Sequence, residues 1–198
     1  MDLRLESRLP VPRACLLELA QRTLDLDDSL PFGHHLLGKV YLWKKQHEKA
    51  IAELKKATAL SPNDADQLVG LGYILNWAGR PEEAIGLVKK AMRLNPMYPL
   101  YYLWELGHAY FLTGRYEEAI ETLKRVLDRN RYFLPAHFYL AASYSEIGRE
   151  EEARAEVVEI ERLKSPQDSL EARRQRLPYK DQAVLERLFD SLRKAGLK

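Results

Sequence analysis

The sequence has a single cysteine, no long apolar run and almost no net charge. One cysteine, Cys15, cannot form an internal disulfide, so we expect the chain in a reducing compartment. The net charge of +2 is too small for a dedicated nucleic-acid binder, whose basic surface shifts the balance much further. Residues 1–20 carry two glutamates and two prolines in place of a signal-peptide core, and no stretch is long enough to span a membrane. We therefore expect a cytoplasmic protein that binds neither nucleic acid nor membrane.

A period of about 34 residues organises the chain. Small residues mark it at steps of 34, 35 and 34, and each is followed twelve positions later by an alanine. The pairs are Gly38 with Ala50, Gly72 with Ala84, Gly107 with Ala119, and Ala141 with Ala153. In three of the pairs a Gly-Arg dipeptide lies between the two members: Gly79-Arg80, Gly114-Arg115 and Gly148-Arg149. The first pair has Lys45-Gln46 at this place. Such a period predicts stacked helical hairpins.

The residue types at these positions fit a helical hairpin. Small residues such as Gly72 and Ala84 let two helices cross closely, and larger ones such as Leu75 and Val88 fill the space beside them. Glycine after the first helix supplies the left-handed conformation that ends it, and a proline such as Pro62 marks the exit from the second helix. With 46% hydrophobic and 30% charged residues, the 198-residue chain suits one globular domain.

In these features the chain resembles the tetratricopeptide repeat family. The resemblance covers roughly residues 30–167 and implies an all-α, right-handed α-solenoid. It implies four hairpins, at about 31–64, 65–99, 100–133 and 134–167. Val126 and Ile160 depart from the small residue usual in the second helix, and one residue is inserted near Tyr98-Pro99. We expect wider or more bent junctions at these places.

Residues 1–29 are expected to form an arm and half a repeat. Residues 12–26 match the second helix of a repeat, but the first helix of that repeat is missing. The apolar stripe of this helix would therefore lack its usual cover; it consists of Leu16, Leu19, Ala20 and Thr23. The arm of residues 1–10, or packing in a crystal, could be enough to cover this stripe. Otherwise the chain was cut from a longer polypeptide, or the stripe pairs with another copy of the chain.

Residues 168–198 are expected to close the stack. Residues 168–176 predict a short basic helix, and residues 177–180 predict a break after it. Asp181 is expected to be the N-cap of a last helix that ends near Gly196. The last helix has an apolar face of Val184, Leu185, Leu188, Phe189 and Leu192, with Arg187, Arg193 and Lys194 opposite, as a cap requires. We interpret the basic cluster as a solvated face near the acidic residues 150–161, in preference to a phosphate or acidic-partner site; it comprises Arg173, Arg174, Arg176 and Lys180.

Several stretches resemble a narrower group, the repeat region downstream of the catalytic domain in many bacterial class III adenylate and guanylate cyclases. They are NWAGRPEEAI at 76–85, AMRLNP at 91–96, LPYKD at 177–181 and LRKAGL at 192–197. The chain has no room for the cyclase catalytic domain. The resemblance therefore implies an accessory signalling module without nucleotide chemistry of its own.

The resemblance to the repeat family also implies a concave groove lined by the first helix of each hairpin. When the inner positions of the family's repeat are carried over to this sequence, the groove residues are Phe32, His35, Lys39, Trp43, Tyr73, Asn76, Trp77, Tyr101, Trp104, His108, Phe111, Phe138 and Tyr139, with Leu42, Val69, Glu105 and Ser145 beside them. One surface cannot bury nine aromatic rings, so we expect some of them to face a ligand, and the sequence leaves open which. Trp43 and Trp77 stand 34 apart and are expected to project side by side.

An aromatic groove suits an apolar peptide or an amphipathic helix. The rings would anchor it, while His35, Asn76 and His108 would fix its orientation. Relatives that capture acidic chaperone tails use basic residues and asparagine at the inner positions. Here Lys39 alone is basic, and the other such positions are His35, Gly70, Tyr101 and Glu105. We therefore exclude a carboxylate clamp.

Motifs for catalysis or metal binding are weak. Glu105 and His108 have the Glu-x-x-His spacing of di-iron bundles but lack the second copy and further glutamates that such sites need. His34 and His35 are adjacent, so they point about 100° apart on a helix and cannot chelate together unaided. Cys15 has no histidine in its own helix to activate it. We expect no enzyme, no cofactor and no metal.

The sequence therefore predicts a scaffold or adaptor that binds a protein or peptide in an aromatic groove. Self-association through the N-terminal half-repeat is a second expected mode of contact. The alternative is a regulatory or dimerising segment of a class III nucleotide-cyclase-type signalling protein.

Overall fold

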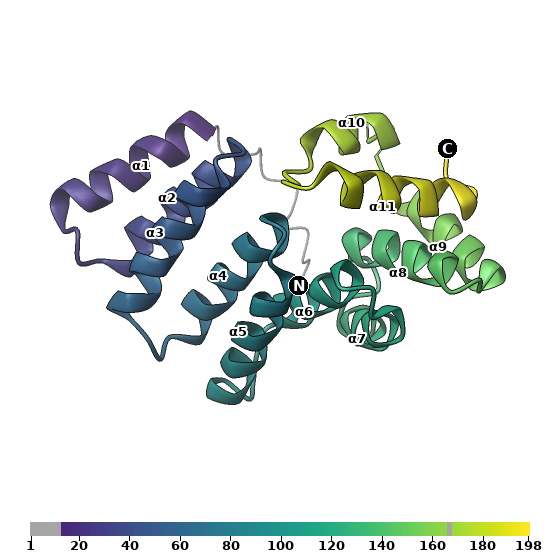
Figure 1. Ribbon diagram of the computed structural model, residues 1–198, viewed down its shortest axis with the longest axis horizontal. Coiled ribbons are helices and arrows are strands. Elements are labelled where there is room, and N and C mark those ends of the chain that lie inside the picture. Colours follow the sequence, from purple (N-terminus) through teal and green to yellow (C-terminus); the bar gives the residue numbers. More distant parts are fainter. Residues whose placement is uncertain (1–12, 166–167) are drawn as a thin grey trace, which may run out of the picture.

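The computed structural model describes residues 13–165 and 168–198, over which the chain forms eleven α-helices and no β-strand. In chain order the helices are α1 (Arg13–Leu26), α2 (Pro31–Trp43), α3 (His47–Leu60), α4 (Ala65–Trp77), α5 (Pro81–Leu94), α6 (Leu100–Leu112), α7 (Tyr116–Arg129), α8 (Leu134–Glu146), α9 (Glu150–Leu163), α10 (Leu170–Arg176) and α11 (Gln182–Lys194). Consecutive helices from α2 to α9 pair into hairpins that stack into an arc, and α11 packs on α8 (Figure 1). The predicted α-solenoid with a capping helix is confirmed. Within the described residues, no helix is long and apolar enough to cross a membrane.

Glycine sets the distance between the two helices of a hairpin. A methyl group on Gly38 would lie 1.9 Å from Leu54 Cδ2 and 3.2 Å from the carbonyl oxygen of Ala50. The equivalent atom on Gly107 would lie 2.8 Å from Leu123 Cδ2. Because such distances are below van der Waals contact, only glycine permits this crossing without displacing the partner helix.

The turns inside the hairpins use the left-handed conformation that the Gly-Arg steps predict. Gly79, Gly114 and Gly148 have φ values of 78°, 74° and 75°, and Lys45 takes φ 57° at the equivalent point of the first hairpin. The residue after each glycine donates its amide to a carbonyl of the preceding helix; Arg80 donates to Leu75 at 2.9 Å. This bond satisfies a carbonyl at the helix end and turns the chain toward the second helix.

Helix α1 packs on α2, just as α3 packs on α4 and α5 on α6. Ala20 is fully buried, Leu16 is half-buried and Leu19 is 49% exposed. The predicted apolar stripe is thus partly covered by α2. The arm of residues 1–10 lies outside the described residues, and self-association at this edge stays a prediction.

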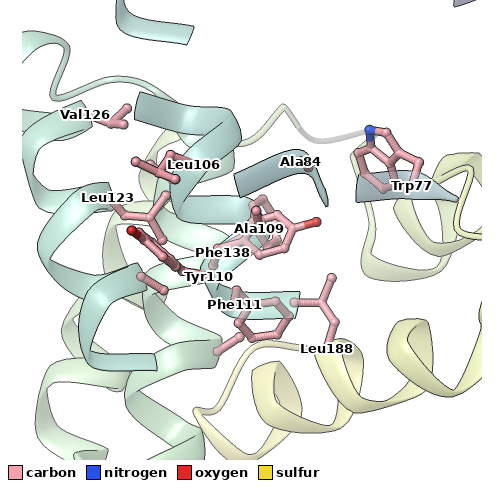
Figure 2. Close-up of a cluster of buried hydrophobic side chains, with 14 of the residues drawn as sticks. Trp77, Ala84, Leu106, Ala109, Tyr110, Phe111, Leu123, Val126, Phe138 and Leu188 are labelled. Carbon is pink, nitrogen blue, oxygen red and sulfur yellow. The ribbon is translucent and has the colours of Figure 1, made fainter. Parts of the chain in front are cut away.

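A continuous apolar core runs from α2 and α3 through the stack to α11. Val126 and Ile160, the large residues at positions where the family usually has small ones, are fully buried in it. Leu188 of α11 points toward Phe111 of α6, so the cap joins the core of the third hairpin (Figure 2). The apolar face predicted for the last helix is therefore the face that packs.

The structure corrects part of two expectations about basic residues at the C-terminal end. Arg187 does not face solvent: its guanidinium lies 5.8 Å from the Phe111 ring centroid and donates to the carbonyl of Leu112. In the basic cluster, Arg176 and Lys180 are exposed as expected, but the ion-pair partners of the cluster lie outside residues 150–161. Arg173 and Arg176 pair with Asp168, Arg174 pairs with Glu186, and Lys180 pairs with Glu48. Periodicity located these residues on the helix but could not show the neighbours that the fold brings to them.

Replacing Gly38 with alanine should lower the free energy of unfolding by about 1–3 kcal/mol, because the methyl group overfills the contact with Leu54. Gly86 provides the matched control, since it lies exposed in α5 with no atom within 4 Å of an added Cβ. Gly86→Ala should raise the free energy of unfolding by about 0.5–1 kcal/mol through helix propensity. Urea unfolding followed by circular dichroism measures both. Equal effects of the two substitutions would show that close approach does not position α2 against α3.

Candidate functional site

The segment from Leu177 to Lys180, between α10 and α11, crosses the inner surface of the solenoid. We call these four residues the strap. The amide of Lys180 donates to the carbonyl of Trp77 at 3.0 Å, and its ammonium group lies 2.7 Å from Glu48 Oε1 at the start of α3. The strap therefore connects the C-terminal end of the stack to its first two hairpins.

Tyr179 is the anchor of the strap. Its side chain is 2% exposed, and its ring centroid lies 4.5 Å from that of Trp77. The hydroxyl lies 2.8 Å from His108 Nε2 and 2.5 Å from the Tyr139 hydroxyl. A tyrosine buried with its hydroxyl satisfied combines a large apolar contact with a specific orientation. Residues from α4, α6 and α8 thus form one pocket around a side chain from the strap.

The structure divides the thirteen predicted groove residues between two regions. Phe32, His35, Lys39, Trp43, Tyr73 and Tyr101 line an open pocket. The others do not line it: Trp104 is half-buried, and six are buried, namely Asn76, Trp77, His108, Phe111, Phe138 and Tyr139. Of the residues expected beside them, Val69 and Glu105 line the pocket, Ser145 is half-buried and Leu42 is buried in the core.

The strap, α10 and α11 account for much of this burial. Tyr179 covers Trp77 and His108, Arg173 of α10 lies 4.0 Å from the Phe138 ring centroid, and α11 covers Phe111. Trp77 still lies next to the open pocket, because its ring centroid is 6.3 Å from that of Tyr73. The inner surface therefore has a half closed by the chain itself and a half open to a ligand.

The open pocket lies between α2 and α4 and reaches the start of α6. Its volume is about 720 Å³. Besides the predicted residues, it is lined by Leu36, Asp64, Asp66, Gln67, Val69, Gly70 and Glu105. Its walls thus combine aromatic and aliphatic side chains with several carboxylates, which is the mixture of apolar surface and placed polar groups that binding pockets use.

Gly70 shapes the wall between α2 and α4. A Cβ atom there would lie 2.4 Å from His35 Cε1, so only glycine lets the imidazole lie across α4. His35 Nδ1 is 2.9 Å from Gln67 Oε1, which fixes the ring. Burial lowers the pKa of His35, as does the nearby charge of Lys39. His35 is therefore a neutral part of the wall at physiological pH.

The carboxylates at the start of α4 are held by neutral donors. Asp64 caps the helix by accepting the amides of Asp66 and Gln67. Asp66 accepts hydrogen bonds from the hydroxyls of Tyr101 and Tyr102, which lower the pKa of its carboxyl group. Asp66 is thus ionised at neutral pH and gives this end of the pocket a negative charge.

Glu105 is the most unusual group in the pocket wall. It is 4% exposed, and burial raises the pKa of its carboxyl group to about 8. Asn76 Nδ2 donates to its Oε2 at 3.2 Å and to its backbone oxygen at 3.1 Å. The amide expected to orient a ligand instead supports this carboxyl group. Lys39 of α2 is the basic group whose charge acts on Glu105.

Sequence reasoning did not include Asp64, Asp66 or Gln67 among the site residues, because they precede or begin the inner helix. The signal for Asp64 was present, since an aspartate before an apolar helix is a typical N-cap. Glu105 and His108, which shared a metal-like spacing, point to different partners, Asn76 and Tyr179. Within residues 13–165 and 168–198, no three His, Cys, Asp or Glu side chains gather as a metal site would require.

Comparison with known families identifies the repeat. A tetratricopeptide repeat model matches residues 41–103 and 110–167, which together make more than half of the chain. A second tetratricopeptide repeat model matches residues 78–132. No curated protein sequence matches the chain.

Solved structures with a similar fold include those of three other proteins. PilW, a type IV pilus biogenesis factor, is 17% identical, with a TM-score of 0.67 over 94% of this chain and 90% of its own. TTC0263, a thermophilic TPR protein from Thermus thermophilus, is 23% identical, with a TM-score of 0.65 over 91% and 90%. MamA is 22% identical, with a TM-score of 0.60 over 76% and 90%. At these identities the likeness concerns the fold, and it gives no support to the predicted link with cyclase repeat regions.

Two of the buried titratable groups of the inner surface, His108 and Glu105, should give opposite pH dependences. Burial lowers the pKa of His108 from 6.5 to about 3, so stability is lost as pH falls from 6.5 toward 3 because the unfolded state takes up the proton. Burial raises the pKa of Glu105 from 4.5 to about 8, so stability is lost as pH rises from 4.5 toward 8. The two contributions cancel between pH 4.5 and 6.5, and above pH 6.5 the loss from Glu105 remains.

Between pH 6.5 and 8, the free energy of unfolding of the wild type should therefore fall by about 1.4 kcal/mol per pH unit because of Glu105. The Glu105→Gln variant should lack this fall. Urea unfolding at several pH values measures the difference between variant and wild type. Glu82→Gln, at an exposed position of α5, is the control and should leave the wild-type curve unchanged. Parallel curves for wild type and Glu105→Gln would contradict a protonated Glu105.

Tyr179→Phe should lower the free energy of unfolding by about 1–3 kcal/mol, because His108 and Tyr139 lose a buried hydrogen-bond partner. Tyr179→Ala should cost about 3–5 kcal/mol and make Trp77 accessible to a fluorescence quencher such as acrylamide. Tyr132→Phe, on an exposed ring, is the control and should change neither quantity. Unchanged quenching in a folded Tyr179→Ala protein would show that the strap does not cover Trp77.

Proposed function

We propose that this chain, which belongs to the tetratricopeptide repeat family, is a protein-interaction scaffold that binds an extended apolar peptide in its open pocket. Proteins of this family generally act as non-enzymatic scaffolds, and PilW and MamA share the fold. The partner in this proposal is a segment of another protein. The helices α2, α4 and α6 form its binding surface.

The observation that carries the proposal is the strap, a peptide segment already seated on the same inner surface. It is bound by a main-chain hydrogen bond from Lys180 to Trp77 and by the ring of Tyr179 in an aromatic pocket. Peptide recognition uses the same two elements, backbone hydrogen bonds for affinity and side-chain pockets for specificity. The open pocket adjoins this segment through Tyr73 and Trp77. A second peptide could therefore bind beside the strap in the same manner.

The open pocket has anchors of the kind that dominate peptide binding. Phe32 is 59% exposed although it lies on an inner helix, and Trp43 and Tyr73 are half-buried in the wall. Aromatic side chains in a desolvated pocket are the residue types that contribute most to association. A volume of about 720 Å³ is sufficient for two or three peptide side chains.

Selection from random short peptides displayed on phage tests this proposal. Wild-type protein should enrich peptides with apolar residues. Phe32→Ala and Trp43→Ala should each weaken binding of a selected peptide by about tenfold or more, measured by isothermal titration calorimetry. Circular dichroism should show unchanged helicity.

Val158→Ala supplies the control, because this exposed side chain lies on α9 and outside the pocket. Its affinity for the selected peptide should equal that of the wild type. Failure to enrich any peptide would overturn the proposed function. Equal loss of affinity in all three variants would place the binding site elsewhere.

A further inference from the structure

We infer that the bound peptide carries a lysine or arginine whose cationic group reaches Glu105 at the inner wall of the open pocket. The inference rests on the proposed function, since it specifies the chemistry of the peptide bound there. It defines a partner segment in which a basic residue stands beside an aromatic or aliphatic one. Three features of the pocket support it.

The first feature is the environment of the Glu105 carboxyl group. It lines the pocket, is 4% exposed, and has neutral donors around it: Asn76 Nδ2 at 3.2 Å and the adjacent indole of Trp104. The ion pairs found among residues 13–165 and 168–198 do not include Glu105. A carboxylate buried without a cation is costly, and a cation supplied at hydrogen-bond distance offsets that cost. Lys39 acts on Glu105 through its charge but forms no ion pair with it in the described part of the chain, so the carboxyl group has room for a ligand cation at hydrogen-bond distance.

The second feature is the charge of the pocket wall. Asp64, Asp66 and Glu105 face a single basic side chain, Lys39. Lys39 is exposed and forms no ion pair within the described part of the chain. The carboxylates therefore outnumber the cations, and the pocket is complementary to a basic ligand. An acidic ligand would have Lys39 alone as its partner.

The third feature is the composition of the strap. Tyr179 fills the aromatic pocket of the closed half, and the next residue, Lys180, pairs with Glu48. The occupant of the closed half is therefore an aromatic residue followed by a basic one. The walls of the open pocket offer surfaces for the same two residue types, the aromatic rings of Trp43 and Tyr73 and the carboxyl group of Glu105. A peptide of similar chemistry fits it.

Two substitutions in the pocket distinguish a basic from an acidic ligand. Glu105→Gln keeps the shape of the side chain but cannot ionise beside a ligand cation, and Lys39→Met removes the positive charge. For a basic peptide, Glu105→Gln should weaken binding by about tenfold or more. Lys39→Met should strengthen it severalfold, because a like charge is removed. An acidic ligand would give the opposite pattern.

The probes are the peptides enriched by wild-type protein from the random phage library and, for each, a synthetic copy with its Lys or Arg replaced by Gln. Calorimetry measures both peptides against wild type, Glu105→Gln, Lys39→Met and the control Glu82→Gln. The Lys-to-Gln change should lower affinity for wild type and Glu82→Gln about tenfold but should have little further effect on Glu105→Gln. Circular dichroism confirms that each variant is folded.

The results separate this inference from the proposed function. Enriched peptides that contain Lys or Arg and lose affinity with Glu105→Gln support both. Enriched peptides that are acidic or uncharged, or whose affinity does not depend on Glu105, overturn the inference and leave the proposed function standing. If the wild type enriches no peptide, the proposed function fails and the inference fails with it.

Discussion

The close crossing of the two helices in each hairpin is the constraint from which the rest of the structure follows. Gly38, Gly72 and Gly107 bring the inner helices of the first three hairpins so close to their outer partners that an added Cβ would lie 1.9 to 3.0 Å from the nearest side chain, and the fourth hairpin has the small, fully buried Ala141 at this position. Because the same crossing recurs, the inner helices line up along one side of the stack. Their remaining side chains then form a continuous surface, and both the strap and the open pocket lie on it.

The repeat fold was predictable because its determinants are local. A period near 34, Gly-Arg turns and an Asp181 N-cap each act within a few residues, so the sequence shows them directly. The hairpin turns have the left-handed glycines expected of them. The inner face was also assigned from the repeat, and Phe32 and Trp43 do line a pocket.

The division of the inner surface could not be predicted, because it depends on contacts between distant residues. Nothing near Tyr179 in the sequence indicates that it lies between His108 and Tyr139. The break at residues 177–180 was visible, but its destination was set by the shape of the completed stack. Glu105 likewise has the same sequence signature as an ordinary helix-surface residue, and its unusual environment arises only from Asn76 and the surrounding rings.

The strap also changes how the repeats depend on one another. In a simple repeat array each unit contacts its neighbours, so stability is a sum of local terms and the ends can unfold first. Here Lys180 contacts residues of the first and second hairpins, 132 positions away in the case of Glu48. This long-range contact makes the last helix sensitive to the state of the first hairpin. The array should therefore unfold more cooperatively than its linear architecture alone implies, with the strap contacts forming after the local hairpins.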